Sequence, residues 1–259
     1  MKMARYLCED AIIIRGDMEQ YSKFSIMVTE IIAERSPLFE KTSIDEFYVD
    51  VTGMDKFFGC LKWTSELKAY ITRHTGLPIS FGLSVNKTVS KMVTNEAKPN
   101  GGMQVESKRV KPFMFPLSIR KIPMLGEKTF RLLRSMGIVT IKTLSEVPVE
   151  MMQSVLGKNG IMLWKKANGI DNTPVKPYHE RKSISTERTF QQDTIDVEHL
   201  RSVLTGMVER ITFQLRKEGK LTACVTVKIR YSNFDTYTQQ KHIPYTSLDH
   251  TLLNTANEL

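Results

Sequence analysis

Apolar residues recur three or four positions apart over several stretches of the chain, which is the spacing of one helix face. Between Asp17 and Ser36 this pattern predicts an amphipathic helix that is capped by Asp17, with Gln20 completing a loose capping box, and that ends at Ser36-Pro37. The same spacing predicts helices over 55–74, 86–95 and 197–217, the end of a helix over 1–9, and a further helix that opens at Asp249.

Short apolar runs and period-two alternation predict strands between these helices. Phe47, Val49 and Val51, for example, alternate with Tyr48 and Asp50. The expected strands are a buried one at 11–14, two flanking the acidic turn at 38–42 and 47–51, and others at 78–83, 184–190, 221–231 and 236–244.

These elements divide into three patterns, so we expect an α+β multidomain protein. Residues 1–110 mix strands and helices, 111–168 are wholly helical, and 183–259 combine helices and strands again. Residues 169–182 are mostly polar, contain two prolines and are predicted to be a linker.

Composition narrows the class of protein further. With 259 residues, 41% of them hydrophobic and 25% charged, the chain is typical of a soluble globular protein of two or three modules. It has no apolar run of the roughly 18 residues that span a membrane, and the segment MKMARYLCED lacks the apolar h-region expected of a signal peptide. Three widely spaced cysteines favour reduced thiols, so we expect a cytoplasmic protein without membrane association.

The net charge of +9 is unevenly distributed. Residues 1–110 hold 15 Lys and Arg against 14 Asp and Glu, whereas residues 111–259 hold 22 against 14. This asymmetry is compatible with a polyanion partner for the second half or with a merely basic surface.

The segment KTSIDEFYVDVTG places Asp45 and Glu46 side by side in a predicted turn between strands. Mg²⁺ prefers carboxylate oxygens and is often held by one or two carboxylates plus substrate phosphates. The alternative is an acidic turn that only keeps the tip of a hairpin hydrated.

Lys98, in the segment NEAKPNGG, follows a helix and could direct its ammonium group toward a triphosphate. Lys87 and Lys91 lie one turn apart on that helix and could share a face. All three could equally be solvated surface lysines.

Residues 119–144 predict a helix, a tight hairpin and a second helix, whose core would be formed by Ile122, Leu125, Phe130, Leu133 and Ile138. Gly126 permits close backbone approach, and the free N–H groups that follow it can bind phosphate without reading sequence. Positive charge is added by Lys121, Lys128, Arg131 and Arg134. The alternative is a plain helical hairpin.

In RKSISTERTF, basic residues alternate with small hydroxyl side chains along a predicted strand that could follow a nucleic-acid backbone; a solvated edge strand is the alternative. The five histidines show no metal-ligand spacing, and no Ser-His-Asp or Cys-His arrangement is visible.

Four segments in this order resemble Y-family translesion DNA polymerases, especially the DNA polymerase IV branch: SIDEFYVDVTG, GLSVNKTVSKMVTNEAKPNGG, IPMLGEKT within the hairpin, and RKSISTERTF. The resemblance implies a partial palm at 1–110, a thumb with a helix-hairpin-helix at 111–168, a linker at 169–182 and an incomplete little finger at 183–259.

The resemblance also implies roles for individual residues. Asp45 and Glu46 would be the catalytic carboxylates that hold two Mg²⁺ ions, and Lys98 would contact the triphosphate of the incoming dNTP. Asp50 matches a family position but is interpreted as structural. Primer-template DNA would be bound by Met124, Gly126 and Lys128 of the hairpin and by Lys182, Ser183 and Arg188 of the basic segment.

The chain also departs from the family pattern. Nothing matches the family's metal-binding aspartate motif near its N-terminus, its fingers or its clamp-binding tail, so we expect a fragment truncated at both ends. The sliding clamp is a partner only of the intact family members. Methionine stands at position 124, where family members often have glycine.

We therefore expect part of a DNA-directed DNA polymerase, which transfers a nucleotidyl group from dNTP to a primer 3′-hydroxyl and which, as this chain alone, binds DNA but extends it poorly. A non-catalytic DNA-binding module is the alternative. A nucleotidyl cyclase is a weaker alternative, because the turn lacks the Gly-Gly-Asp/Glu-Glu-Phe pattern of that class.

Overall fold

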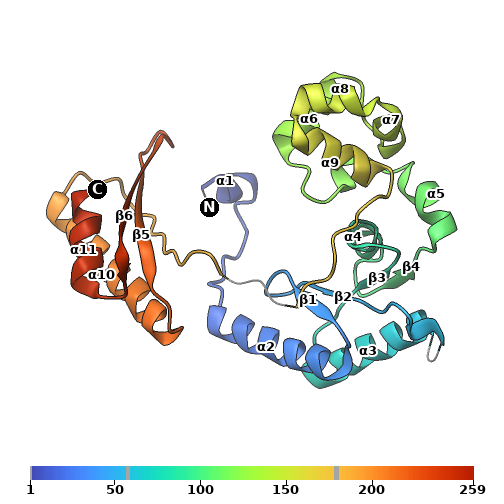
Figure 1. The fold of residues 1–259 in the computed structure, drawn as a ribbon, viewed down its shortest axis with the longest axis horizontal. Coiled ribbons are helices and arrows are strands. Elements are labelled where there is room, and N and C mark those ends of the chain that lie inside the picture. Colours follow the sequence, from blue (N-terminus) through green and yellow to red (C-terminus); the bar gives the residue numbers. More distant parts are fainter. Residues whose placement is uncertain (1, 57–58, 178–180) are drawn as a thin grey trace. The chain divides into compact units, whose positions relative to one another are not determined.

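A computed structural model describes residues 2–56, 59–177 and 181–259. The chain divides into two compact units, Met1–His179 (unit 1) and Glu180–Leu259 (unit 2), each of which is described by itself. Helices and small sheets alternate through both (Figure 1), so the fold is of the expected α+β multidomain class. Among the described residues, no helix is long and apolar enough to cross a membrane.

The first part of unit 1 combines four helices with two small sheets. Its elements are α1 (Lys2–Leu7), α2 (Met18–Arg35), β1 (Phe39–Lys41), β2 (Phe47–Val49), α3 (Cys60–Thr75), β3 (Phe81–Leu83), α4 (Lys87–Glu96) and β4 (Gly102–Gln104). β1 and β2 pair antiparallel, whereas β3 and β4 pair parallel. β4 was not among the strands predicted from the sequence.

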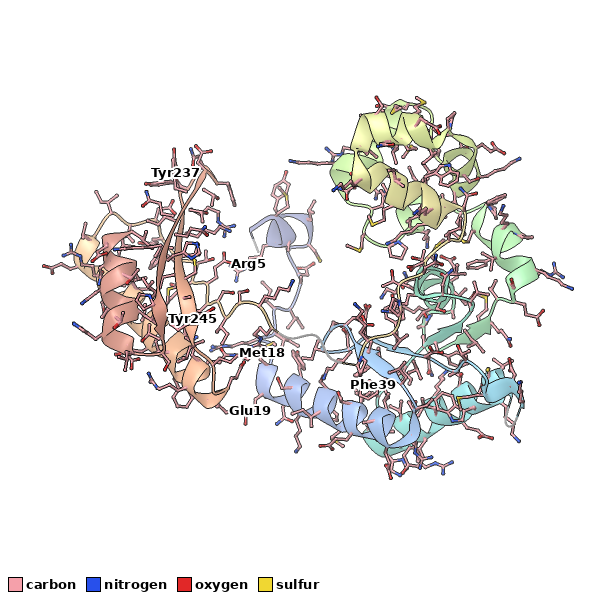
Figure 2. The ribbon with its side chains drawn as sticks, in the orientation of Figure 1. Arg5, Met18, Glu19, Phe39, Tyr237 and Tyr245 are labelled. Atoms are coloured by element: carbon pink, nitrogen blue, oxygen red, sulfur yellow. The ribbon has the colours of Figure 1, made fainter. Side chains whose placement is uncertain are left out.

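α2 begins as its sequence predicted. The carboxylate of Asp17 accepts hydrogen bonds from the backbone N–H groups of Glu19 and Gln20, both at 3.1 Å. These bonds satisfy two of the donors that a helix N-terminus leaves free. α2 and α3 lie along the strands (Figure 1), and their side chains Val28, Ile32, Leu67 and Ile71 form a small core. Phe39 of β1, labelled in Figure 2, packs against this core.

The strand predicted at 11–14 was wrong. These residues form no regular element, and Ile12 and Ile14 are 88% and 84% exposed. A strand needs a neighbour to satisfy its backbone groups, and none of the described strands pairs with this segment.

The second part of unit 1 is helical. It contains α5 (Val110–Met114), α6 (Glu127–Ser135), α7 (Ile141–Glu146), α8 (Val149–Leu156) and α9 (Lys158–Ala167). The largest core of the protein runs from Val89 of α4 to Ala167 of α9, and many of its side chains are fully buried. α4 therefore connects the helical part to the two sheets.

Unit 2 contains α10 (Val197–Lys217), β5 (Thr222–Arg230), β6 (Thr236–Thr246) and α11 (Asp249–Glu258). β5 and β6 form a long antiparallel hairpin, on which Tyr237 and Tyr245 mark opposite ends of β6 (Figure 2). One face of the hairpin packs on α10 and α11 through Val225, Val227 and Ile243.

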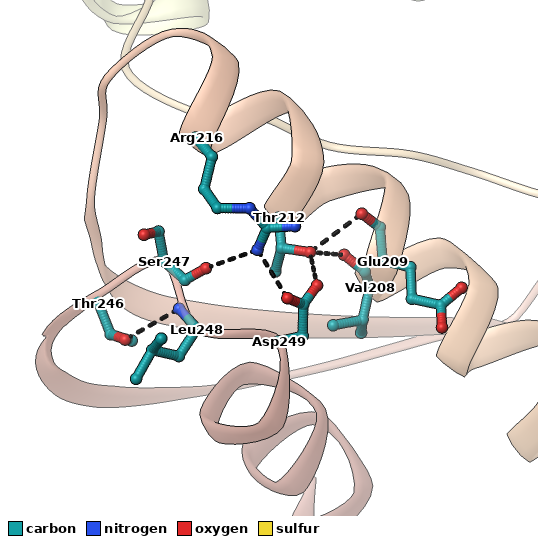
Figure 3. Close-up of polar contacts among 8 residues, drawn as sticks. All are labelled: Val208, Glu209, Thr212, Arg216, Thr246, Ser247, Leu248 and Asp249. Atoms are coloured by element: carbon teal, nitrogen blue, oxygen red, sulfur yellow. Dashed lines mark hydrogen bonds and ion pairs between the residues drawn. The ribbon is translucent and has the colours of Figure 1, made fainter.

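A polar network joins the two helices of unit 2 (Figure 3). The Asp249 carboxylate accepts hydrogen bonds from the Thr212 hydroxyl and from the Arg216 guanidinium, the latter at 2.6 Å. Arg216 also donates to the carbonyl of Ser247 at 3.1 Å. The hydrogen bond from Thr212, followed by that from Arg216, lowers the pKa of Asp249. The network fixes the start of α11 against α10.

The strand predicted at 184–190 was also wrong, because the segment has no regular secondary structure. It is nevertheless held in unit 2: Ile184 packs against the core, Arg181 pairs with Glu218 at 3.0 Å, and Glu187 pairs with Arg230 at 3.1 Å. Side-chain contacts therefore fix this segment without a backbone ladder.

Candidate active site and nucleic-acid interface

Asp45 and Glu46 lie in the turn between β1 and β2, as predicted. The Ser43 hydroxyl donates to Oδ1 of Asp45 at 2.7 Å and accepts from the Asp45 backbone N–H at 3.3 Å. The Ser25 hydroxyl of α2 donates to the carbonyl of Ile44 at 2.5 Å. Asp45 is exposed, but the turn that carries it is anchored to α2.

Two lysines of α4 reach the β1–β2 hairpin. Lys91 forms an ion pair with Glu46, and Lys87 forms one with Glu40 on β1. The sequence suggested that the two lysines share a face, and they do, but they contact acidic side chains within the protein. The Lys87–Glu40 pair is the more buried, with side-chain exposures of 11% and 9% against 24% and 44% for Lys91 and Glu46.

The turn offers the ligands that a magnesium ion prefers. Among the described residues, Oδ2 of Asp45 accepts no hydrogen bond, and the carboxylate of Glu46 is paired with Lys91 alone. No three His, Cys, Asp or Glu side chains come together as a metal site in the described part of the chain. Two adjacent carboxylates therefore fit an ion that is shared with substrate phosphates better than an ion in a closed protein cage.

Lys98 follows the end of α4 and is exposed. It makes no ion pair with any described residue, in contrast to Lys87 and Lys91. From Lys91 to Lys98 the chain advances seven residues, or about 10 Å at helical rise. α4 thus carries a lysine at the acidic turn and leads directly to an unpaired lysine.

The predicted hairpin at 119–144 has the expected core, because Ile122, Phe130, Leu133 and Ile138 are buried and Leu125 packs against them. Its first helix is only a short 3₁₀ turn, Ile119–Lys121. The turn that follows is held to α9 by Lys166, whose ammonium donates to the carbonyl of Pro123 at 3.2 Å. Burial lowers the pKa of Lys166, while nearby Asp171 acts in the opposite direction.

Met124 and Gly126 occupy the tip of this hairpin. Met124 has a φ of 70°, a conformation that glycine adopts more easily, and is 83% exposed. Gly126 caps α6 with an ordinary negative φ, and an added Cβ would meet nothing within 4 Å. Neither the backbone conformation nor the packing of the protein therefore requires glycine at position 126.

Acidic and basic side chains alternate around the start of α6. Glu127 is paired with Arg120 at 2.8 Å and with Arg131 at 2.9 Å, so its negative charge at the hairpin is offset. Lys121 is paired with Glu96 at 2.8 Å. Lys128 and Arg134 make no ion pair with a described residue, which leaves two of the four predicted cations available to a ligand.

Lys182, Ser183 and Arg188 are all exposed in unit 2. They belong to the irregular segment described above and make no ion pair within the described residues. Their side chains are therefore accessible to a ligand, although the segment is irregular and not the strand that the sequence predicted.

Several residues near the acidic turn were missed by the sequence reasoning. Tyr48 of β2 is half-buried; burial, followed by the charges of Glu46, Asp171 and Glu40, raises its pKa. No local pattern marks these partners, which lie far apart in the sequence. Asp50 agrees with a structural role, because hydrogen bonds from Thr52 lower its pKa and hold the chain after β2.

Comparisons with known proteins identify the family to which the sequence is related. Residues 1–95 match the model of the impB/mucB/samB family, and residues 181–259 match the C-terminal domain of the same family. The DNA polymerase IV of Dehalococcoides mccartyi strain BAV1 is 38% identical over 241 residues, which are 93% of this chain and 62% of that protein. The DNA polymerase IV of Methanoculleus marisnigri is 31% identical, covering 98% of this chain and 71% of that protein.

Solved structures show the same fold. A Y-family DNA polymerase chimera matches with a TM-score of 0.86 at 22% identity, over 99% of this chain and 76% of that one. DinB from Sulfolobus solfataricus matches with a TM-score of 0.60 at 20% identity, over the whole of this chain and 75% of that one.

The fold, with its acidic turn and hairpin, is thus of the Y-family DNA polymerase class. Within that class the chain belongs to the impB/mucB/samB family, and it is similar to DNA polymerase IV. The chain spans 62% of the length of the Dehalococcoides relatives that it matches.

Proposed function

We propose that this chain carries part of the active site and DNA interface of a template-directed DNA polymerase of the translesion type. The observation that carries the proposal is the contact between Glu46 and Lys91. It brings the acidic turn to α4, and the exposed Lys98 follows the end of that same helix, so the candidate metal ligands and the candidate phosphate-binding cation are connected through one element.

Asp45 and Glu46 are proposed to hold Mg²⁺ together with the phosphates of a dNTP. When bound, the metal supplies positive charge that stabilises the transferring phosphoryl group and the reacting oxygens. The Ser43 and Ser25 hydroxyl groups keep the turn in place, and the exposed ammonium of Lys98 contacts the triphosphate.

Primer-template DNA is the proposed polyanion partner. The free N–H groups after Gly126, the backbone around Met124 and the ammonium of Lys128 contact phosphates of one strand. Lys182, Ser183 and Arg188 contact the backbone from unit 2. In this proposal residues 1–110 belong to the palm, 111–168 to the thumb and 183–259 to the little finger, with a linker at 169–182. The proposed location is the cytoplasm. A sliding clamp is proposed as a partner of the intact family member, without assigned residues in this chain.

The chain alone is proposed to bind DNA and to extend a primer poorly. Only two carboxylates meet at the turn among the described residues, and one of them is paired with Lys91. Mg²⁺ would therefore be held weakly, and the charge that accelerates nucleotidyl transfer would be only partly in place.

The test is primer extension with purified protein, Mg²⁺ and dNTPs, alongside DNA binding measured by fluorescence anisotropy. We expect clear binding and trace incorporation that Asp45→Asn reduces about a hundredfold or more while binding is retained. Asp50→Asn is the matched control, and incorporation should persist. Robust extension would contradict the proposed weakness of the site, and absence of DNA binding would contradict the proposal as a whole.

A non-catalytic DNA-binding module is the second candidate, favoured by the ion pair that already occupies Glu46. It predicts that incorporation stays at background for both the wild type and Asp45→Asn while both bind DNA equally. Any incorporation that depends on both Mg²⁺ and Asp45 decides in favour of the enzyme.

A further inference from the structure

A very short connection between α4 and β4 carries Lys98, the cation proposed to contact the triphosphate. α4 ends at Glu96 and β4 begins at Gly102, so only residues 97–101 join the two elements. The backbone N–H of Ala97 still makes a helical hydrogen bond, of 3.0 Å, to the carbonyl four residues before it. The first end of the connection is therefore fixed by the helix.

The other end of the connection is fixed against β3. The carbonyl of Gly101 accepts the backbone N–H of Phe81 at 3.1 Å, and the N–H of Gly101 donates to the Ser80 hydroxyl at 3.3 Å. A Cβ at position 101 would lie 2.0 Å from the carbonyl oxygen of Ala97, so the backbone passes too close to the end of α4 for any side chain. Gly102 then pairs with Phe81 in the parallel sheet.

A side chain of α3 makes a third attachment, between these two ends. The ammonium of Lys68 donates to the carbonyl of Asn100 at 2.5 Å, across 32 positions of sequence. Among the described residues, no other donor reaches this carbonyl. Asn100 has a φ of 48°, in the left-handed region that few residues other than glycine and asparagine adopt. The bond from Lys68 therefore holds the connection at its most unusual backbone position.

Lys68 belongs to a well-packed part of α3. Its neighbours Leu67 and Ile71 are buried in the core between α2 and α3. Lys68 is half-buried and makes no ion pair with a described acidic residue, whereas Lys62 of the same helix lies 4.0 Å from Glu66. The Lys68 ammonium is thus engaged with the backbone of the connection and not with a carboxylate.

We propose that Lys68 is a positioning residue for nucleotide binding: it fixes the backbone at Asn100 and thereby the place of Lys98, two residues earlier. The consequence for the nucleotide rests on the proposed function, in which the Lys98 ammonium contacts the triphosphate of a dNTP. A cation on a preorganised backbone loses less conformational freedom on binding than one on a mobile loop. Lys68 does not itself contact the nucleotide, because its ammonium is bonded to the connection.

The test compares three single variants of the full chain. Lys68→Met keeps the apolar part of the side chain and removes the donor, whereas Lys68→Arg retains a donor. Lys62→Met removes a cation from the same helix that lies near Glu66 instead, and it is the matched control for charge. Thermal unfolding checks that each variant folds.

Hydrogen exchange followed by mass spectrometry reports on the connection directly. The N–H of Gly101 is protected by its bond to Ser80, so opening of the connection exposes it to solvent. We expect exchange in peptides that cover 98–102 to accelerate about tenfold or more in Lys68→Met, with rates near those of the wild type in Lys68→Arg and Lys62→Met. Equal exchange in Lys68→Met and Lys62→Met would overturn the attachment.

The second measurement is the affinity for a fluorescent dNTP in the presence of primer-template DNA and Mg²⁺. Lys68→Met should weaken nucleotide binding by about three- to tenfold, while Lys68→Arg and Lys62→Met stay close to the wild type. In a Lys98→Ala background, Lys68→Met should cause no further loss, because Lys68 acts only through Lys98. Additive losses would overturn the positioning role.

The two measurements separate this proposal from the proposed function. Faster exchange in Lys68→Met with unchanged nucleotide affinity would overturn the effect of Lys68 on the nucleotide. If Lys98→Ala left the affinity unchanged, or the wild-type chain bound no nucleotide, the proposed role of Lys98 would fail, and the effect of Lys68 on the nucleotide would fail with it. Hydrogen exchange would still decide whether Lys68 holds the connection.

Discussion

The two parts of unit 1 are stabilised differently. The helical part shares with α4 a large core in which Met114, Ile119 and Leu133 are fully buried, whereas the part with the sheets has a core of four buried side chains between α2 and α3. Its acidic turn depends instead on polar contacts such as Ser25 with Ile44 and Lys91 with Glu46. The candidate metal-binding turn is thus carried by the part with the smaller core, and α4 joins this turn to the larger core.

Removing a side chain from the larger core should have the largest effect. Leu133→Ala should reduce the free energy of unfolding by about 3–5 kcal/mol, because the side chain is fully buried and a cavity would remain. Leu132→Ala, at a neighbouring position that is 41% exposed, should cost less than about 1 kcal/mol. Urea unfolding measures both. Equal losses at the two positions would contradict the position of this core.

The two ion pairs that α4 makes with the β1–β2 hairpin differ in burial, and this allows a sharper comparison. Glu40→Gln leaves Lys87 buried without its partner and should cost about 3 kcal/mol. Glu46→Gln affects a more exposed pair and should cost less than about 1 kcal/mol. The same unfolding measurement separates them; if Glu46→Gln proved the more harmful, burial would not be the deciding factor.

A smaller effect is expected at the hairpin tip. Met124 has a left-handed backbone conformation, which costs a residue with a side chain about 1 kcal/mol relative to glycine. Met124→Gly should therefore be more stable than Met124→Ala by about 1 kcal/mol, as measured by thermal unfolding. A less stable glycine variant would show that the methionine side chain supports the turn.

The smallest effect concerns pH. Burial raises the pKa of Asp171, but hydrogen bonds from Thr173 and Thr88 outweigh it, so the net shift in the folded state is downward. The carboxylate therefore stabilises the fold above the pKa of the unfolded chain, and this contribution is lost as the pH falls through the folded value. The difference in unfolding free energy between the wild type and Asp171→Asn should be constant near pH 7 and should shrink below about pH 4. If this difference in unfolding free energy instead grew as the pH fell, the pKa of Asp171 would be raised in the folded state, not lowered.

Local pattern predicted the helices well. The N-cap at Asp17 and the bounds of α10 were correct because capping and helical periodicity depend on neighbouring residues. The strands expected at 11–14 and 184–190 failed because a strand also requires a partner, which local alternation does not reveal.

For the candidate site, too, the sequence predicted local features but not contacts between distant residues. Sequence placed Asp45 and Glu46 in a turn correctly, since acidic residues between two alternating runs are a local signal. The ion pair between Glu46 and Lys91 and the bond between Thr88 and Asp171 join residues 45 and 83 positions apart. No local rule predicts such pairs. Because of them, Lys87 and Lys91 are internal ion-pair partners, and Asp171 of the predicted linker is bonded to the start of α4.

The most direct test of the central claim is the salt dependence of binding to primer-template DNA. Each phosphate contact that is lost should lower the slope of log affinity against log salt by about 1. We expect Lys128→Ala to lower this slope and weaken binding, whereas Lys142→Ala, at a lysine of α7 that lies 3.9 Å from Glu146, leaves both unchanged. Equal effects of the two substitutions, or DNA binding that does not depend on salt, would contradict the proposed DNA interface.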